Sequence, residues 1–161
     1  MVGPTKRNPR RLRSLAIAVD VAVVDDALAH LGCTADVLTV DPHTLEEVLG
    51  SVTTLGRATS REEAAAALVA SLRARLDDVV RRAAGLDRPR TLVLEWTDPP
   101  FAPGHWVPEM VDRAGGAPVL GTAGEKSFRV DWDRVTAARP EVVVCAPCGY
   151  DLDGSTALVE E

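Results

Sequence analysis

The sequence predicts an α/β fold, in which one long helix precedes a small parallel sheet flanked by helices. Residues 61–84 contain neither glycine nor proline and carry apolar side chains at helical spacing. The second half of the chain then alternates short apolar runs with helical segments, as βαβ units do. Residues 141–146 are almost entirely apolar, which is typical of a buried strand in a parallel sheet.

Composition and charge exclude some classes of partner. The chain has 161 residues, a formal net charge of −6 and 46% hydrophobic residues, as globular proteins do. Five of its 18 basic residues lie in the first 13 positions, so the rest carries 13 basic and 24 acidic residues. An acidic body argues against nucleic acid as a partner, and residues 1–20 are interpreted as a basic tail. No apolar run approaches the ~18 residues that a membrane span requires, so no membrane insertion is expected.

Three short elements precede the long helix. Residues 21–31 are predicted to form a helix, and residues 35–40 alternate as a strand does. Thr44, followed by Glu47 three positions later, forms a capping box that opens a further helix. That helix carries leucine and valine at helical spacing and is expected to end near Gly56.

The long helix has signals at both ends. Ser60 is its candidate N-cap, with Glu63 at the capping-box position. Gly85 and Pro89 are expected to end it. About 24 residues at 1.5 Å per residue give a rod of roughly 36 Å, which is long for a domain of this size.

The elements after the long helix alternate along the chain. They are a strand at 90–95, a helix at 107–114, a short strand at 118–120, a helix from 130 or 131 to 138, and a strand at 141–146. After Asp153 the sequence predicts no further helix to cover the sheet. Since the carboxyl ends of parallel strands meet at one edge of a sheet, the loops 96–106 and 147–153 are expected to open on the same edge.

The first of these loops concentrates the few aromatic residues. Residues 95–109 hold two of the three tryptophans, one of the two phenylalanines and four of the eleven prolines. Ligands bind at this edge of open α/β sheets, and proline lowers the entropy lost when a loop is ordered. Trp96, Phe101 and Trp106 are therefore candidate ligand-binding residues, because aromatic rings offer large rigid contact area. The alternative is a loop whose aromatic residues close one end of the core.

Three further residues are candidates for the same ligand site. His105 can hydrogen-bond a ligand amide or, alternatively, coordinate a metal. Asp98 precedes two prolines, so it either forms a turn or contacts the ligand. Tyr150 follows the last strand and is assigned to the site by its position alone.

The sequence offers little support for catalysis. Cys33, Cys145 and Cys148 are an odd set without disulfide-framework spacing. The last two form a CxxC, but Cys145 falls in a predicted strand rather than at a helix N-terminus, and no second metal-ligand pair accompanies it. No nucleophile elbow or glycine-rich phosphate loop is present. No catalytic residue, metal or cofactor is therefore predicted; a small redox or hydrolytic α/β enzyme, using the CxxC or His105 with Asp98, is the alternative.

These segments together resemble a known family. A strand ending in Glu-Trp-x-Asp-Pro-Pro at 95–100 leads into a Gly-His-Trp-Val-Pro-Glu loop at 104–109 and an Ala-Gly-Gly helix stop at 114–116. With the two preceding helices, this pattern resembles the helical-backbone (class III) substrate-binding proteins of ABC importers, which bind cobalamin or iron siderophores. The resemblance covers roughly residues 23–153, and residues 95–116 most resemble the cobalamin-binding members.

The resemblance implies two α/β lobes joined by one rigid helix, with the ligand in the cleft between them. Residues 60–86 would be the connecting helix, residues 88–161 an incomplete C-terminal lobe, and residues 21–58 the remnant of an N-terminal lobe that is mostly missing. The implied ligand is cobalamin or a related corrinoid, or else another metal chelate. The implied protein partners are ABC permease subunits, with Glu109 paired to a permease arginine. Glu109 alternatively does no more than complement a helix dipole.

The family belongs to the cell envelope, but the N-terminus does not match an export signal. Residues 15–19 are apolar, yet Asp20 interrupts the run and no small-residue cleavage site follows. The chain as encoded is therefore expected in the cytoplasm. A cytosolic corrinoid-binding, other ligand-binding or interaction protein built on the same lobe is accordingly an alternative to the importer component.

Overall fold

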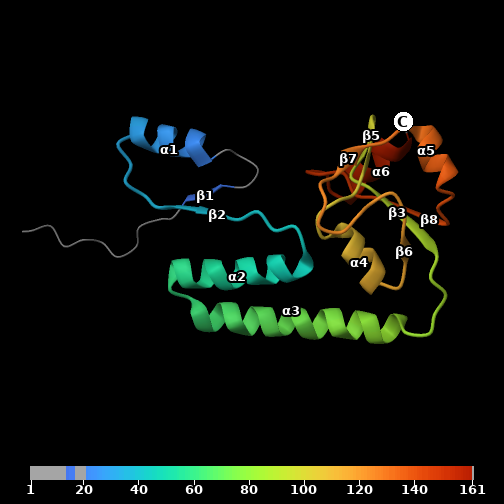
Figure 1. The fold of residues 1–161 in the computed structure, drawn as a ribbon, viewed down its shortest axis with the longest axis horizontal. Coiled ribbons are helices and arrows are strands. Elements are labelled where there is room, and N and C mark those ends of the chain that lie inside the picture. The colour runs from blue at the N-terminus through green and yellow to red at the C-terminus, as the bar shows by residue number, and fades with distance from the viewer. Residues whose placement is uncertain (1–13, 17–20, 161) are drawn as a thin grey trace, which may run out of the picture.

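Two long helices organise the molecule. The structure, a computed structural model, describes residues 14–16 and 21–160. Helices α2 (Leu45–Thr59) and α3 (Glu62–Ala83) run side by side along the long axis (Figure 1). A small N-terminal unit lies beside one end of this pair, and a C-terminal α/β lobe lies at the other end (Figure 1). The predicted class, a small parallel sheet with helices after one long helix, is confirmed.

The N-terminal unit is a strand, a helix and a second strand. These are β1 (Ser14–Ala16), α1 (Val21–His30) and β2 (Val37–Thr39), and β1 pairs with β2 in parallel. The predicted helix and strand of this region are confirmed. Residues 14–16 were assigned to the basic tail, which is wrong because they form a strand whose formation depends on pairing with β2. The other residues of the predicted tail lie outside the described residues.

The turn between α2 and α3 differs from its prediction. Thr44 caps α2 as expected, and its hydroxyl accepts a hydrogen bond from the N–H of Glu47 at 3.2 Å. Ser60, however, does not cap α3. It ends α2 in the left-handed conformation, with φ of 56°, and its N–H donates back into the last turn of α2. Helix α2 also continues past Gly56, which was predicted to end it.

Gly56 is a packing residue rather than a helix stop. A Cβ atom built on Gly56 would lie 2.3 Å from the Cβ of Ala65 on α3, and 3.3 Å from the carbonyl oxygen of Arg61. Ala65 is itself buried, at 7% exposed. The two helices therefore approach each other closely only because residue 56 has no side chain.

Replacing Gly56 with alanine is expected to destabilise the protein by about 1–3 kcal/mol, because the added methyl group overlaps Ala65 in a packed interface. Gly50 in the same helix is the matched control, since a Cβ there meets nothing within 4 Å. Gly50→Ala is expected to be neutral or to stabilise by up to about 1 kcal/mol, because alanine is the better helix former. Urea unfolding of both variants measures the difference, and equal midpoints would contradict the packing role of Gly56.

Helix α3 is the longest element, with 22 residues. Glu62 and Glu63 lie in its first turn and Arg81 and Arg82 in its last, an arrangement that complements the helix dipole. Among the described residues, no helix combines the length and the apolar character needed to cross a bilayer.

The C-terminal lobe alternates strands and helices. They are β3 (Arg90–Leu94), α4 (Val107–Arg113), β6 (Ala117–Pro118), α5 (Trp132–Ala137), β8 (Val142–Cys145) and α6 (Leu152–Glu160). The three strands form a parallel sheet in the order β6–β3–β8. Leu92 and Leu94 on the central strand are 0% and 2% exposed, and they pack in the core with Ala102, Val130 and Val135.

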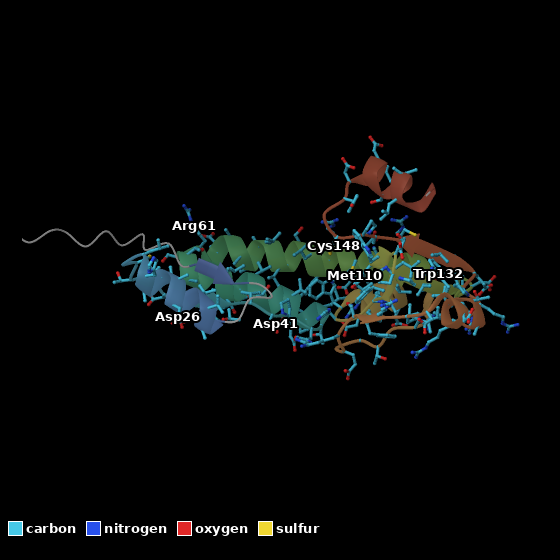
Figure 2. All side chains as sticks on the ribbon, turned by 90° about the horizontal axis from the view of Figure 1, so that it is seen from above. Asp26, Asp41, Arg61, Met110, Trp132 and Cys148 are labelled. Carbon is cyan, nitrogen blue, oxygen red and sulfur yellow. The ribbon has the colours of Figure 1, made fainter. Side chains whose placement is uncertain are left out.

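Three details of this lobe differ from their prediction. Strand β8 was expected to be buried, but its valines at 142–144 are 40–49% exposed. Successive side chains point to opposite faces of the sheet, and β8, at its edge, packs extensively only on β3 among the described elements. The strand predicted at 118–120 lies at 117–118 instead. Helix α6 is present where no helix was predicted, and it stands apart from the rest of the lobe when seen from above (Figure 2).

A second, antiparallel sheet lies within the predicted aromatic loop and beyond it. Strands β4 (Trp96–Thr97), β5 (Pro100–Ala102) and β7 (Phe128–Arg129) pair in that order. Part of the loop is thus a hairpin, and the peptide bond between Asp98 and Pro99 in its turn is cis. The hairpin holds the aromatic residues at fixed register positions.

Candidate functional site

Two loops that follow neighbouring parallel strands meet at the carboxyl edge of the sheet. Trp96 follows β3, and Tyr150 follows β8. Their rings pack edge to face, with centroids 5.7 Å apart and planes at 60°. The indole N–H of Trp96 donates to the carbonyl oxygen of Asp98 at 2.8 Å, which fixes the ring. The prediction that these two loops open on the same edge is therefore confirmed.

Phe101 lies beside Trp96 on the antiparallel sheet. The two residues are directly opposite in the β4–β5 register, so their side chains share a face. Arg129 on β7 is opposite Phe101, which adds a cation to that face. Asp98 is exposed in the hairpin turn, where its carbonyl accepts a hydrogen bond from the ring of Trp96. Of its two predicted roles, turn residue and ligand contact, the structure shows the first. We call Trp96, Phe101 and Tyr150 the edge cluster.

His105 and Trp106 belong to a second group, at the start of α4. Their ring centroids are 5.9 Å apart, and the His105 ring lies 5.1 Å from that of His43. Trp106 is half-buried at the N-cap position of α4. Among the described residues, no ring contact joins this group to Trp96 and Tyr150. We call His43, His105 and Trp106 the junction cluster.

A neighbouring loop fixes the backbone around His105. The N–H of His105 donates to the carbonyl of Glu125 at 2.6 Å, and the N–H of Gly124 donates to the carbonyl of His105 at 3.0 Å. A Cβ atom on Gly104 would lie 2.3 Å from the backbone N of Ser127 and 2.5 Å from the carbonyl oxygen of Glu125. The two loops can approach this closely only because residue 104 is glycine.

His43 is a member of the site that the sequence did not reveal. Its ring Nδ1 lies 3.1 Å from the carbonyl oxygen of Gly124, and its Nε2 lies 3.4 Å from the carboxylate of Asp41. The hydrogen bond to Gly124, followed by that to Asp41, raises the pKa of His43. The turn before α2 predicted a helix cap there, but no sequence pattern linked this turn to His105.

Glu109 has a partner within the chain. It lies in the first turn of α4 after Pro108 and is half-buried, and its Oε2 accepts a hydrogen bond from the N–H of Leu45 at 2.7 Å. Leu45 is the first residue of α2, so Glu109 satisfies one of the N–H groups left unpaired at that helix terminus. The negative charge also complements the dipole of α2.

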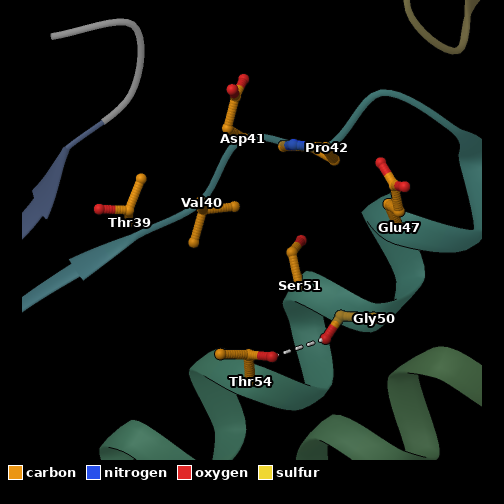
Figure 3. Close-up of a pocket in the computed structure, with 8 residues that line it drawn as sticks. All are labelled: Thr39, Val40, Asp41, Pro42, Glu47, Gly50, Ser51 and Thr54. Atoms are coloured by element: carbon orange, nitrogen blue, oxygen red, sulfur yellow. Dashed lines mark hydrogen bonds between the residues drawn. The ribbon is translucent and has the colours of Figure 1, made fainter. Parts of the chain in front are cut away.

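Two of the surface pockets are lined without the aromatic residues of either cluster. A pocket of about 300 Å³ lies between α2 and the connection from β2 to α2 (Figure 3). Asp41, Glu47, Ser51 and Thr54 give it a polar wall. A second pocket, of about 460 Å³, lies along α4 and includes Glu109. Neither contains an aromatic residue, so the predicted ligand-binding rings form no part of either pocket.

The described part of the chain contains no cluster of three His, Cys, Asp or Glu side chains that would hold a metal ion. The three cysteines are free thiols: Cys145 is half-buried, and Cys33 and Cys148 are exposed. The ring of His105 contacts those of His43 and Trp106.

Comparison with known proteins gives one family and several structures of similar fold. The family model described as "Periplasmic binding protein" matches residues 15–159. The ABC-type Fe3+-hydroxamate transport system of Saccharomonospora viridis is 25% identical with a TM-score of 0.68, over 90% of this chain and 52% of that one. The periplasmic vitamin B12 binding protein BtuF of Vibrio cholerae is 20% identical with a TM-score of 0.59, over 77% and 49%. S. aureus IsdE, complexed with heme, is 17% identical with a TM-score of 0.69, over 91% and 58%.

The chain thus spans about half the length of these solved proteins. Among curated proteins, none matches it in sequence.

Proposed function

The chain belongs to the periplasmic binding protein family, and we propose that it acts as a substrate-binding component of an ABC importer. The structures that it resembles include a vitamin B12 binding protein, a protein complexed with heme and a hydroxamate transport protein. Cobalamin, heme and ferric hydroxamates are all metal chelates. The proposed ligand is therefore a metal chelate that is bound and released without chemical change.

Within this class, we propose cobalamin or a related corrinoid as the ligand. The observation that carries this choice is the edge cluster, in which Trp96 packs on Tyr150 and shares a face with Phe101. A flat macrocycle can bury much of its apolar area against such rigid rings. His105 and Trp106 would contact a second part of the ligand, where the His105 ring can hydrogen-bond an amide of the corrin periphery. The proposed site is an inter-lobe cleft, of which the C-terminal lobe supplies one wall.

We further propose that Glu109 pairs with an arginine of the permease. Its carboxylate already accepts the N–H of Leu45. A carboxylate offers about four acceptor positions, so this cap leaves it able to accept from a guanidinium as well. The pocket of about 460 Å³ beside Glu109, which Asp112 and Arg113 also line, offers room for a long side chain.

Titration of the purified chain with cyanocobalamin, followed by tryptophan fluorescence and melting temperature, tests the ligand. We expect quenching and a raised melting temperature, because a ligand that binds only the folded state stabilises it, by about 2.7 kcal/mol at 100 times Kd. N-acetyltryptophanamide in the same titration corrects for light absorbed by the corrin.

Hemin and a ferric hydroxamate, titrated in parallel, distinguish a corrinoid-specific site from one that binds another metal chelate. A response to either of these without a response to cyanocobalamin would refute the corrinoid and retain a metal chelate. If the chain is shown by circular dichroism to be folded and binds none of the three compounds, the proposed binding function is contradicted.

A further inference from the structure

Two side chains fasten the N-terminus of α2 to the C-terminal lobe, one from each side. From the α2 side, the Nδ1 of His43 bonds to the carbonyl of Gly124 at 3.1 Å. From the lobe, Glu109 accepts the N–H of Leu45 at 2.7 Å. The start of α2 accordingly lies beside α4 (Figure 1).

His43 supports His105, its neighbour in the junction cluster, at two points. Its ring lies 5.1 Å from that of His105, at an angle of 59°. Its bonding partner Gly124 is also the residue whose N–H holds the carbonyl of His105 at 3.0 Å. Loss of the His43 ring therefore removes a contact from the side chain of His105 and a restraint from its backbone neighbour. The His105 ring in turn contacts Trp106.

We propose that His43 is a positioning residue for the ligand site, which holds His105 and Trp106 in the arrangement that receives the ligand. In this role His43 acts through His105 and makes no contact with the ligand itself. The inference rests on the proposed ligand-binding function, but the placement of Trp106 is measurable without any ligand.

The protonation state of His43 sets how firmly it holds the loop. Nδ1 must carry a hydrogen to donate to Gly124, and Nε2 must carry one to donate to Asp41, so both bonds form together only in the imidazolium. The bonds to Gly124 and Asp41 raise the pKa of His43 above its ordinary value. Because the folded-state pKa is raised, the added stability is complete below about pH 6.5 and is lost as the pH rises through the folded value.

Three titratable groups face this ring from the elements packed around it. Asp41 on the same loop and Glu47 on α2 favour its charge. The third group is His105 on the opposing loop, whose ring centroid lies 5.1 Å away. The support for Trp106 is therefore expected to be strongest at mildly acidic pH and to weaken towards pH 8.

Two variants and a control test the role of His43. His43→Ala removes the ring, whereas His43→Asn keeps a donor where Nδ1 stood and cannot titrate. His30→Ala, which changes an exposed histidine at the end of α1, is the matched control. The readouts are the indole N–H resonance of Trp106 without ligand, between pH 5.5 and 8, and the Kd for cyanocobalamin.

We expect the pH dependence of the Trp106 resonance to be the same in the wild type and in His30→Ala, and to be smaller in both His43 variants. His43→Ala is expected to bind cyanocobalamin about fivefold more weakly, the factor that one ordinary hydrogen bond contributes, and His43→Asn to recover most of this loss.

If folded His43→Ala and the wild type give the same Trp106 resonance at pH 5.5 and at pH 8, the positioning role is overturned. A resonance that moves while the Kd stays unchanged would overturn its link to the ligand. If the wild-type chain does not bind cyanocobalamin, the proposal of a corrinoid ligand is refuted. The resonance measured without ligand then decides whether His43 positions Trp106.

Discussion

Gly104→Ala is expected to destabilise the protein by about 3 kcal/mol or more. A Cβ on Gly104 would lie 2.3–2.5 Å from three backbone atoms of the loop at 125–127. Backbone atoms cannot rotate aside as the end of a side chain can, so the loops must separate. That separation breaks the two hydrogen bonds that join His105 to this loop.

Urea unfolding followed by circular dichroism measures this loss. Gly50→Ala serves again as the control, because its Cβ meets open space on a helix. A Gly104→Ala variant with the unfolding midpoint of the wild type would show that the loops do not pack as closely as described.

Removal of the Trp96 ring is expected to weaken cyanocobalamin binding at least ~20-fold. Truncating an aromatic residue that anchors a ligand costs about 2 kcal/mol of binding free energy, which corresponds to this factor. Trp96 is the centre of the edge cluster, since it contacts Tyr150 and shares a face with Phe101. Calorimetric titration of Trp96→Ala with cyanocobalamin gives the change in Kd.

Trp132→Ala is the matched control for this prediction. Trp132 is the third tryptophan, 53% exposed on α5 and in neither cluster. Its loss is expected to leave the Kd unchanged. Equal effects of the two substitutions would refute the edge cluster as the ligand surface.

Local sequence patterns predicted five of the six described helices, α6 being the exception, and predicted their ends less well. The run without glycine or proline placed α3 to within a residue or so, and the Thr44–Glu47 box placed the start of α2. Ser60 and Gly56 were misinterpreted because their roles come from the packing of α2 on α3, which no local pattern contains. An edge strand and a central strand can carry the same apolar run, so the exposure of β8 was not predictable either.

The contacts of the candidate site likewise divide into those that the sequence predicted and those that it did not. The contact between Trp96 and Tyr150 followed from a general rule, that neighbouring parallel strands end at one edge. The contact between His43 and His105 followed from no rule, because it depends on how two irregular loops meet after α2 has packed against the lobe. Pairing of β5 with β7 likewise joins segments that lie far apart in sequence, so the antiparallel sheet was not predicted.

The most direct test of the proposed corrinoid site is the indole N–H spectrum of the ¹⁵N-labelled chain during titration with cyanocobalamin. The three tryptophans give three resonances, assigned by substitution. Binding at the proposed site is expected to shift Trp96 and Trp106 to saturation at a common Kd and to leave Trp132 in place. A spectrum in which none of the three resonances moves, or in which that of Trp132 alone moves, would contradict binding at the proposed site.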